Sequence, residues 1–233
     1  MVAPPPKPAS AASTAASREA FIRMHTVLAR TPLVPEIALH LATDVTLLWH
    51  ATEAWLAARD VPAPFWAFSW AGGQALARFL LDDPGSVAGK RVLDLASGGG
   101  VVAIAAARAG ARSVIAVDVD PFAEAAARLN AAANGVTLDV RTTDVTTSGP
   151  PDVDVILAGD VCYEHDAAAR FERWLRASVA AGVRVLLGDP ERAYAPQRGL
   201  RALASYDVPT PVDLEGRTVR RAHVWEVLAG DLD

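Results

Sequence analysis

Cysteine is almost missing from this sequence, in which Cys162 is the only one among 233 residues. A single thiol excludes an intrachain disulfide framework and a cysteine-based zinc site. We therefore expect a chain that depends on its apolar core for stability, in a reducing compartment such as the cytoplasm. Hydrophobic residues make up 52% of the chain and charged residues 21%, which suits a sizeable core.

An excess of positive charge and long hydrophobic runs are missing too. The net charge of −5 and the pI near 5.5 argue against an ordinary basic nucleic-acid surface. No apolar stretch approaches the roughly 20 residues of a membrane-spanning helix. Residues 1–17 are mainly Pro, Ala and Ser, without the hydrophobic segment of a secretory signal; they lack the Arg typical of a mitochondrial presequence, although they also lack acids. We expect a disordered tail over 1–17.

What the sequence does contain is an apolar strand over 91–95 that leads into three glycines at 98–100 and an Ala-rich helix over 101–109. Glycine has no Cβ, so the backbone can turn sharply there and a ligand can approach it closely. Ligands of open α/β sheets bind at the carboxyl ends of the strands. This turn is therefore the first candidate for a binding site, with Ala96, Gly98 and Gly100 next to the ligand.

Two ligands fit a glycine-rich turn between a strand and a helix. The pattern Gly98-x-Gly100-x-x-Ala103, with Asp118 about 20 residues further on, matches a dinucleotide site loosely. Asp94 argues against the dinucleotide, because a carboxylate repels a diphosphate. It attracts instead a ligand with ammonium and sulfonium groups. S-adenosylmethionine carries both and has no phosphate. The alternative is that Asp94 only caps the loop through backbone N–H groups.

Further acids follow the next predicted strands, which are 113–118 with Asp118, 137–141 with Asp144 and 152–160 with Asp160. Helices between the first three strands make them parallel through right-handed crossovers, so these acids share one edge of the sheet. We expect Asp118 to hold the ribose hydroxyls. We expect Asp144 either to accept from the adenine amine or to be a solvated loop residue.

If the ligand is S-adenosylmethionine, the reaction is the transfer of its methyl group. Asp160 and Tyr163 indicate which kind of molecule accepts that methyl group. A carboxylate and an aromatic ring together suit an amine, since the acid accepts N–H bonds and the ring face favours positive charge. A free lysine has a pKa of about 10.4, so its deprotonation costs roughly 4–5 kcal/mol at neutral pH. Because Asp160 would oppose that deprotonation, we assign it to orientation of the amine. His165 with its acidic neighbours lacks a spaced set of ligands, so no metal is expected.

The remaining segments indicate one α/β domain with an extension. Helical patterns over 18–29 and 44–58 predict an N-terminal helical cap over 18–62. Within the domain over 63–233, we expect Trp70 to line a cleft next to Gly72 and Gly73, although such aromatic residues are often core. Further predictions are the helices 74–81, 121–134, 166–180 and 195–204 and the strands 183–187, 205–208 and 221–228. The expected fold is a seven-stranded Rossmann-like sheet with helices on both faces.

Three patterns carry a resemblance to a known family: Val92-Leu93-Asp94-Leu95-x-Ser97-Gly98-x-Gly100, Gly159-Asp160-x-x-Tyr163, and Pro64-Phe65-Trp66-Ala67-x-x-Trp70-x-Gly72-Gly73-Gln74. The chain resembles the seven-β-strand S-adenosylmethionine-dependent methyltransferases, and within them the family of electron transfer flavoprotein β-subunit lysine methyltransferases. The resemblance covers roughly Glu19 to Ala229. One departure is Gly99, where the family often has Cys or Thr, and we expect this change to be harmless.

The resemblance implies S-adenosylmethionine bound by Asp94, Gly98, Gly100 and Asp118, with Trp70 and Asp144 lining the pocket. We place Ala96 and Gly159 beside it. The resemblance also implies a protein lysine held by Asp160 and Tyr163, in the flavoprotein β-subunit or a ribosomal protein. We favour a cytoplasmic monomer that binds neither nucleic acid nor membrane. The alternatives are a small-molecule N-methyltransferase, a non-catalytic S-adenosylmethionine-binding or partner-binding module, and a nicotinamide-dependent oxidoreductase.

Overall fold

A computed structural model of the chain describes residues 14–44, 46, 48–51 and 53–229. Its centre is a seven-stranded sheet in the order β5-β4-β3-β6-β7-β9-β8. The strands are β3 (Arg91–Leu95), β4 (Ser113–Asp118), β5 (Asp139–Thr142), β6 (Val155–Gly159), β7 (Arg184–Asp189), β8 (Leu200–Pro209) and β9 (Val219–Val227). The first five are parallel and the last two are antiparallel to their neighbours, so five carboxyl ends meet at one edge.

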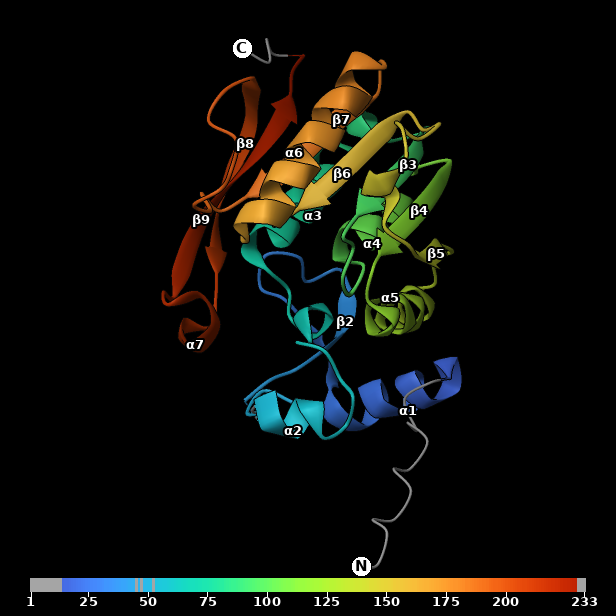
Figure 1. The fold of residues 1–233 in the computed structure, drawn as a ribbon, viewed down its shortest axis with the longest axis vertical. Coiled ribbons are helices and arrows are strands. Elements are labelled where there is room, and N and C mark those ends of the chain that lie inside the picture. The colour runs from blue at the N-terminus through green and yellow to red at the C-terminus, as the bar shows by residue number, and fades with distance from the viewer. Residues whose placement is uncertain (1–13, 45, 47, 52, 230–233) are drawn as a thin grey trace, which may run out of the picture.

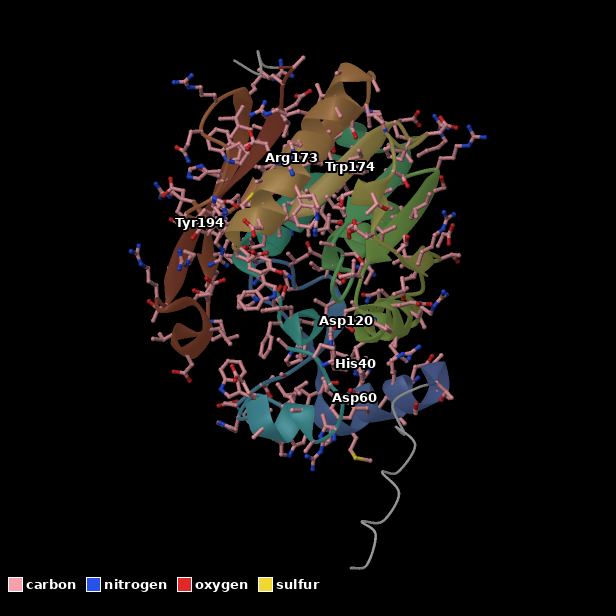
Figure 2. The ribbon with its side chains drawn as sticks, viewed as in Figure 1. His40, Asp60, Asp120, Arg173, Trp174 and Tyr194 are labelled. Carbon is pink, nitrogen blue, oxygen red and sulfur yellow. The ribbon has the colours of Figure 1, made fainter. Side chains whose placement is uncertain are left out.

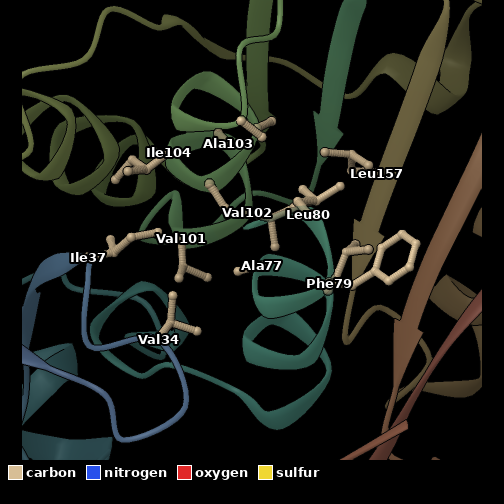
Figure 3. Packing of buried hydrophobic residues seen from close by; sticks show 14 of the residues in the cluster. Val34, Ile37, Ala77, Phe79, Leu80, Val101, Val102, Ala103, Ile104 and Leu157 are labelled. Atoms are coloured by element: carbon tan, nitrogen blue, oxygen red, sulfur yellow. The ribbon is translucent and has the colours of Figure 1, made fainter. Parts of the chain in front are cut away.

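Helices cover both faces of the sheet, as the sequence predicts (Figure 1). The helices α3 (Ala71–Asp82), α4 (Val101–Arg108) and α5 (Pro121–Ala133) contribute to one large apolar cluster with the strands. Figure 3 shows part of this cluster, in which Val101, Val102 and Ala77 lie between α3 and α4. The helix α6 (His165–Ala180) packs Trp174 and Leu175 against the opposite face. Burial on both faces explains why the strands read as continuous apolar runs.

One predicted helix is wrong. The sequence predicts a helix over 195–204 from its Leu, Arg and Ala residues, which have high helix propensity. The structure instead has the long strand β8, which pairs with β9 from Leu200 to Pro209. Pairing with a neighbouring strand overrides the local propensity, because the hydrogen bonds and side-chain packing come from outside the segment.

The N-terminal segment is also less helical than predicted. It contains α1 (Ala15–His25), a hairpin of β1 (Val27–Arg30) and β2 (Ala38–Leu41), and the short helix α2 (Glu53–Ala57). Most of the predicted tail lies outside the described residues, but residues 15–17 form the start of α1. Thr26 ends this helix in an extended conformation, and its hydroxyl donates to the Ile22 carbonyl oxygen.

Asn130 of α5 and Asn134, the residue that caps its C-terminus, attach this segment to the sheet domain. Asn134 bonds both the N–H and the carbonyl of Ala38, and Asn130 accepts from the N–H of His40 at 2.7 Å. Apolar residues of the segment join Phe122 of α5 in a further cluster. Figure 2 shows His40 and Asp120 between the sheet and the N-terminal helices. The hairpin is thereby held next to the glycine turn. None of the described helices is both long and apolar enough to cross a membrane.

Candidate functional site

The glycine turn lies between β3 and α4 and has an unusual backbone. Gly98 and Gly100 have φ angles of 51° and 82°, and the non-glycine Ala96 has 51°. Gly99 is required for a different reason, because a Cβ there would lie 2.8 Å from the carbonyl oxygen of Trp66. Such an approach between a Cβ and a backbone atom forces a shift. The turn therefore admits a neighbouring backbone that a larger residue would displace.

Asp94 lies directly beneath this turn and is 1% exposed. Its Oδ2 accepts from the N–H of Ala103 at 3.0 Å, so it does cap the first turn of α4. Burial, with a smaller contribution from the charge of Asp118, raises the pKa of its carboxyl to about 8. Among the described residues no cation forms an ion pair with it. A cationic ligand next to Asp94 would supply the missing countercharge.

Asp118 ends β4 and holds the turn from the side. Its Oδ2 accepts from the N–H of Gly98 at 2.9 Å, and its Oδ1 accepts from the N–H of Asp120 at 3.0 Å. Burial raises the pKa of this carboxyl as well, against these backbone bonds. Each carboxylate oxygen can accept a second bond, so Asp118 can hold a ligand hydroxyl without releasing the turn.

A cavity with about 490 Å³ of empty space opens at the turn, between the sheet edge and the N-terminal hairpin. Of the predicted cofactor residues, those that line it are Trp70, Asp94, Ala96, Gly98 and Gly159. Gly100 and Asp118 lie behind this lining and shape the turn. The cavity lies at the carboxyl ends of β3 and β6, where the order of strands in the sheet reverses. Ligands of open α/β sheets bind at this point.

Asp144 occupies a loop position and does not line the cavity. It caps the 3-10 helix η3 (Val145–Thr147), accepting from the N–H of Thr146 at 3.0 Å and from the Thr146 hydroxyl. The Thr146 hydroxyl is the main reason that the pKa of its carboxyl is lowered. Its contact with adenine stays a prediction.

The aromatic segment divides into core and cleft wall. Trp66 is 1% exposed and stacks on Phe122, so it belongs to the core. Trp66 also borders the cavity, as does Trp70, whose Nε1 donates to the carbonyl oxygen of Phe65 at 3.0 Å. The ring of Phe65 also lies 5.5 Å from the ring of Tyr163. These contacts form a continuous aromatic wall at the mouth of the cavity.

Four glycines bring α3 into contact with the ends of β6 and β7. A Cβ at Gly72 would lie 2.4 Å from the carbonyl oxygen of Gly188, and one at Gly159 would lie 2.9 Å from the Cα of Gly73. The sequence predicts that the pair Gly72-Gly73 belongs to a cleft wall. In the structure, the backbone of α3 at these glycines contacts the backbone at the ends of β6 and β7. This contact leaves no space for side chains.

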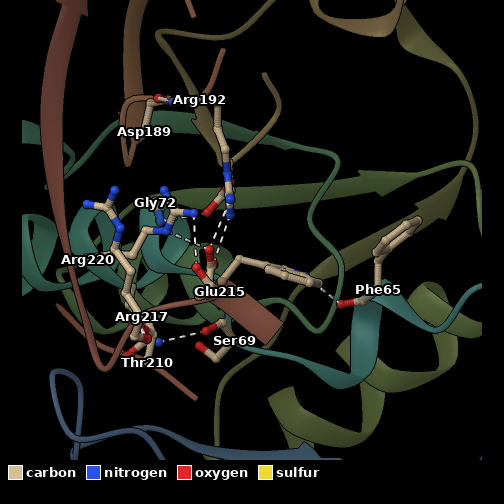
Figure 4. Close-up of polar contacts among 12 residues, drawn as sticks. Phe65, Ser69, Gly72, Asp189, Arg192, Thr210, Glu215, Arg217 and Arg220 are labelled. Carbon is tan, nitrogen blue, oxygen red and sulfur yellow. Dashed lines mark hydrogen bonds and ion pairs between the residues drawn. The ribbon is translucent and has the colours of Figure 1, made fainter. Parts of the chain in front are cut away.

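Asp160 follows β6 with a φ of 60° and is 6% exposed. Its Oδ2 accepts from the N–H of Gly72 at 2.8 Å, and its Oδ1 accepts from Nε of Arg192 at 2.7 Å. Arg192 also forms two bonds with Glu215, of 2.9 and 3.0 Å (Figure 4). Burial raises the pKa of Asp160, and Arg192 opposes this rise. The carboxylate thus connects the end of β6 with α3. Through Arg192 and Glu215 it also connects with the C-terminal hairpin, which is formed by β8 and β9.

Tyr163 lies three residues beyond Asp160, with 53% of its surface exposed, and its ring contacts that of Phe65, which lines the cavity. Burial of its hydroxyl, followed by the charges of Asp118 and Glu164, raises its pKa, so the phenol stays neutral at physiological pH. The predicted pair therefore has one buried member, Asp160, and one accessible member, Tyr163.

Sequence reasoning misses three residues of this region. Arg192 and Glu215 approach Asp160 only through the fold, and no local pattern marks them. Asn130 lines the cavity, and its Nδ2 donates to the carbonyl oxygen of Gly99 at 2.8 Å. Its position in the middle of an Ala-rich helix is the one signal that could have identified it, since a buried polar residue there requires partners.

Comparisons with known proteins show the family and the fold of this chain. A profile of the family "Ribosomal protein L11 methyltransferase (PrmA)" matches residues 76–161. The electron transfer flavoprotein beta subunit lysine methyltransferase of Rattus norvegicus is 39% identical over 201 residues, covering 83% of this chain and 77% of that protein. The Homo sapiens protein of the same name is 34% identical over 215 residues, covering 89% and 80%. The crystal structure of ribosomal protein L11 methylase from Lactobacillus delbrueckii subsp. bulgaricus has the same fold, with a TM-score of 0.51 and 19% identity, over 87% of this chain and 100% of that one.

Proposed function

Because the chain belongs to the family of electron transfer flavoprotein β-subunit lysine methyltransferases, we propose that it methylates a lysine of that flavoprotein subunit. It is an S-adenosylmethionine-dependent methyltransferase. A ribosomal protein is the second candidate substrate, supported by the partial match to the ribosomal protein L11 methyltransferase family. The observation that carries the proposal is the cavity lined by Asp94 and by an aromatic wall that reaches Tyr163.

The residues of the turn fit the methyl donor. Asp94 is a buried carboxylate without a paired cation among the described residues, and the donor has an ammonium and a sulfonium group. Gly98 and Gly100 present backbone rather than side chains, and Asp118 keeps lone pairs for hydroxyl groups. When bound, S-adenosylmethionine supplies an electrophilic methyl group on sulfur. We propose that Trp70, Ala96 and Gly159 border it and that Asp144 reaches its adenine.

Tyr163 and Asp160 are the proposed acceptor residues. The exposed ring of Tyr163 can lie against the lysine side chain and favour its positive charge before transfer. Asp160 has two lone pairs beyond those that Gly72 and Arg192 occupy, so it can accept from an amine without losing either partner. Because the carboxylate is already paired with a cation, it holds the amine proton less strongly than an unpaired acid would. We therefore propose that Asp160 orients the amine, so that the amine nitrogen lies in line with the methyl group that it accepts.

The surface around Tyr163 favours a protein as substrate over a small molecule. Glu164 and Asp166, one and three residues after Tyr163, are both exposed, which suits a basic segment. A small amine as substrate would favour a closed aromatic pocket. Phe65 and Tyr163 are each about half exposed, so the site is open. These features support the lysine proposal without excluding amines of other proteins.

Two incubations with labelled S-adenosylmethionine test the proposal, one with purified electron transfer flavoprotein β-subunit and one with a cell lysate. We expect label on a lysine of the subunit, located by mass spectrometry of the digested protein. Label in a ribosomal protein instead would move the substrate assignment to the second candidate. Label confined to small molecules of a lysate would refute protein methylation.

We further propose that the enzyme acts in the cytoplasm as a monomer. Its single thiol, Cys162, is buried, and burial with the nearby charge of Asp189 raises the pKa of that thiol. A chain of this kind needs no oxidising compartment. Cell fractionation and light scattering of the purified protein test the two statements.

A further inference from the structure

A second cavity adjoins the donor cavity. It has about 1000 Å³ of empty space and shares Leu41, Phe68 and Ser69 with the first. Its walls come from the N-terminal hairpin, from the start of α3 and from residues 209–214, which include part of α7 (Val212–Glu215). Pro209 and Pro211, which flank the Thr210 labelled in Figure 4, line the cavity together with Ser69. Methyl transfer as described above assigns no role to this space.

The wall of this cavity holds an unusual number of unpaired oxygens. In the part of the chain that the structure describes, the side-chain oxygens of four lining residues are buried without a hydrogen-bond partner: Thr31, Thr43, Ser69 and Gln74. Thr31 is 6% exposed and Gln74 is 3% exposed. Native proteins pair nearly all buried polar atoms, so such a group of four calls for an explanation. The most direct explanation is a ligand that forms hydrogen bonds with these four oxygens.

The chemistry of the wall restricts that ligand. The amide nitrogen of Gln74 donates to the carbonyl oxygen of Ser69 at 2.7 Å, which leaves Oε1 of Gln74 as an acceptor. Three lining residues, Pro32, Pro209 and Pro211, have no backbone N–H to offer it. The three hydroxyls can each donate as well as accept, whereas Oε1 of Gln74 only accepts, so the ligand must offer both N–H donors and oxygen acceptors.

Charge adds a second restriction. Asp44 and Asp213 line the cavity and are exposed, so its entrance is acidic. The single lining cation, Arg30 among the described residues, is engaged with the carbonyl oxygen of Pro35. Trp49 and Phe68 add apolar surface. A basic ligand with apolar parts and several N–H groups matches all of these features.

We propose that this cavity binds the peptide segment of the substrate protein that flanks the acceptor lysine, an inference that rests on the proposed lysine methylation. An extended peptide presents backbone N–H groups at regular intervals and places alternate side chains on opposite sides. The shared residues Leu41, Phe68 and Ser69 lie where the segment passes from this cavity to the donor cavity. The two threonine oxygens are buried in the free protein, so peptide binding requires a rotation of each side chain about χ1.

The double substitution Thr31→Val and Thr43→Val tests the inference. Each hydroxyl oxygen lacks a partner, so the substitution breaks no hydrogen bond of the folded chain and the melting temperature should not fall. With the flavoprotein β-subunit as substrate, we expect KM for the protein to rise about tenfold, with kcat and the affinity for S-adenosylmethionine unchanged. Thr210→Val is the matched control, because its hydroxyl is satisfied by the carbonyl oxygen of Arg217 at 2.8 Å; its KM should not change.

The failures of the two proposals are distinct. If the unmodified enzyme labels no lysine, the proposed function fails. If it labels lysine but the double variant keeps the original KM within twofold, the peptide site alone is overturned. Competition decides the occupant: a synthetic peptide around the methylated lysine should inhibit, whereas N-acetyl-lysine amide at the same concentration should not. Equal inhibition by both would replace the peptide with a single amine.

Discussion

Nε of Arg192 donates to Oδ1 of Asp160 across 2.7 Å, although the two residues are 32 positions apart. The bond brings a guanidinium to one side of the carboxylate that we assign to the acceptor amine. Arg192 is in turn fixed by Glu215, which also pairs with Arg220 at 3.0 Å. The geometry of the acceptor side therefore depends on the C-terminal hairpin, far along the chain from the glycine turn.

Arg192→Ala should destabilise the fold strongly. The substitution leaves the buried carboxylates of Asp160 and Glu215 with one partner fewer, and removal of one member of a buried ion pair costs roughly 3–5 kcal/mol. The free energy of unfolding in urea measures the loss. Arg221→Ala is the control, because its bond to Asp207 is exposed and should contribute at most about 1 kcal/mol. Equal losses for the two variants would contradict the importance of the buried network.

Donor binding should release a proton near neutral pH. The pKa of Asp94 is raised to about 8, so its carboxyl is largely protonated in the free enzyme at pH 6–7, whereas the cationic donor favours the ionised form. Affinity should therefore rise with pH up to about 8. Calorimetric titration in buffers of different ionisation enthalpy measures the released proton. Asp94→Asn should bind more weakly and release none; proton release by this variant would assign the effect to another group.

The same carboxyl should make the free enzyme less stable as pH rises. A folded-state pKa above the unfolded value means that the folded chain holds a proton that the unfolded chain loses between about pH 4 and 8. The contribution of Asp94 to the free energy of unfolding therefore falls through that window. Urea unfolding at pH 5 and pH 8 should show a smaller decline for Asp94→Asn than for the unmodified protein.

Gly188→Ala should disturb the acceptor side through the backbone. A Cβ there would lie 2.3 Å from the carbonyl oxygen of Gly72 and 2.8 Å from Cβ of Leu76, neither of which is a flexible chain end. We expect about 1–3 kcal/mol of lost stability from overpacking, and lower kcat because Gly72 then shifts away from Asp160. Gly149→Ala is the control, since its Cβ would meet no atom within 4 Å.

Gly99→Thr should weaken donor binding. The new Cβ would lie 2.8 Å from the carbonyl oxygen of Trp66, so the short helix η1 (Phe65–Ala67) must move away. Our sequence-based expectation that Gly99 is harmless where the family often has Cys or Thr stays a prediction. Equilibrium dialysis with S-adenosylmethionine checks it, and unchanged affinity would show that η1 yields without cost.

Tyr163→Ala should lower kcat/KM for the protein substrate about tenfold, because a cation–π contact contributes roughly 1–2 kcal/mol. Tyr194 is similarly exposed, at 45% against 53%, and Tyr194→Ala should have little effect. Steady-state kinetics with both variants measure the difference. Loss of activity in both would indicate a general role of the surface rather than a specific contact.

The sequence by itself determined the glycine turn, the parallel strands and their terminal acids. These features are local: glycine permits the positive φ of Gly98 and Gly100, and apolar runs that end in acids place Asp94 and Asp118 at one edge. Strand order, by contrast, and the strand at 200–209 depend on pairing with distant segments, which is why helix propensity predicted the wrong element there.

Only the tertiary structure decided what surrounds those acids. Arg192 reaches Asp160, Asn130 reaches Gly99, and the N-terminal hairpin closes one side of the donor cavity because Asn130 and Asn134 bond its edge. Such contacts join residues that are far apart in the chain, and no periodic pattern records them. The physical reason is that a buried polar group must find a partner, but the fold chooses which one.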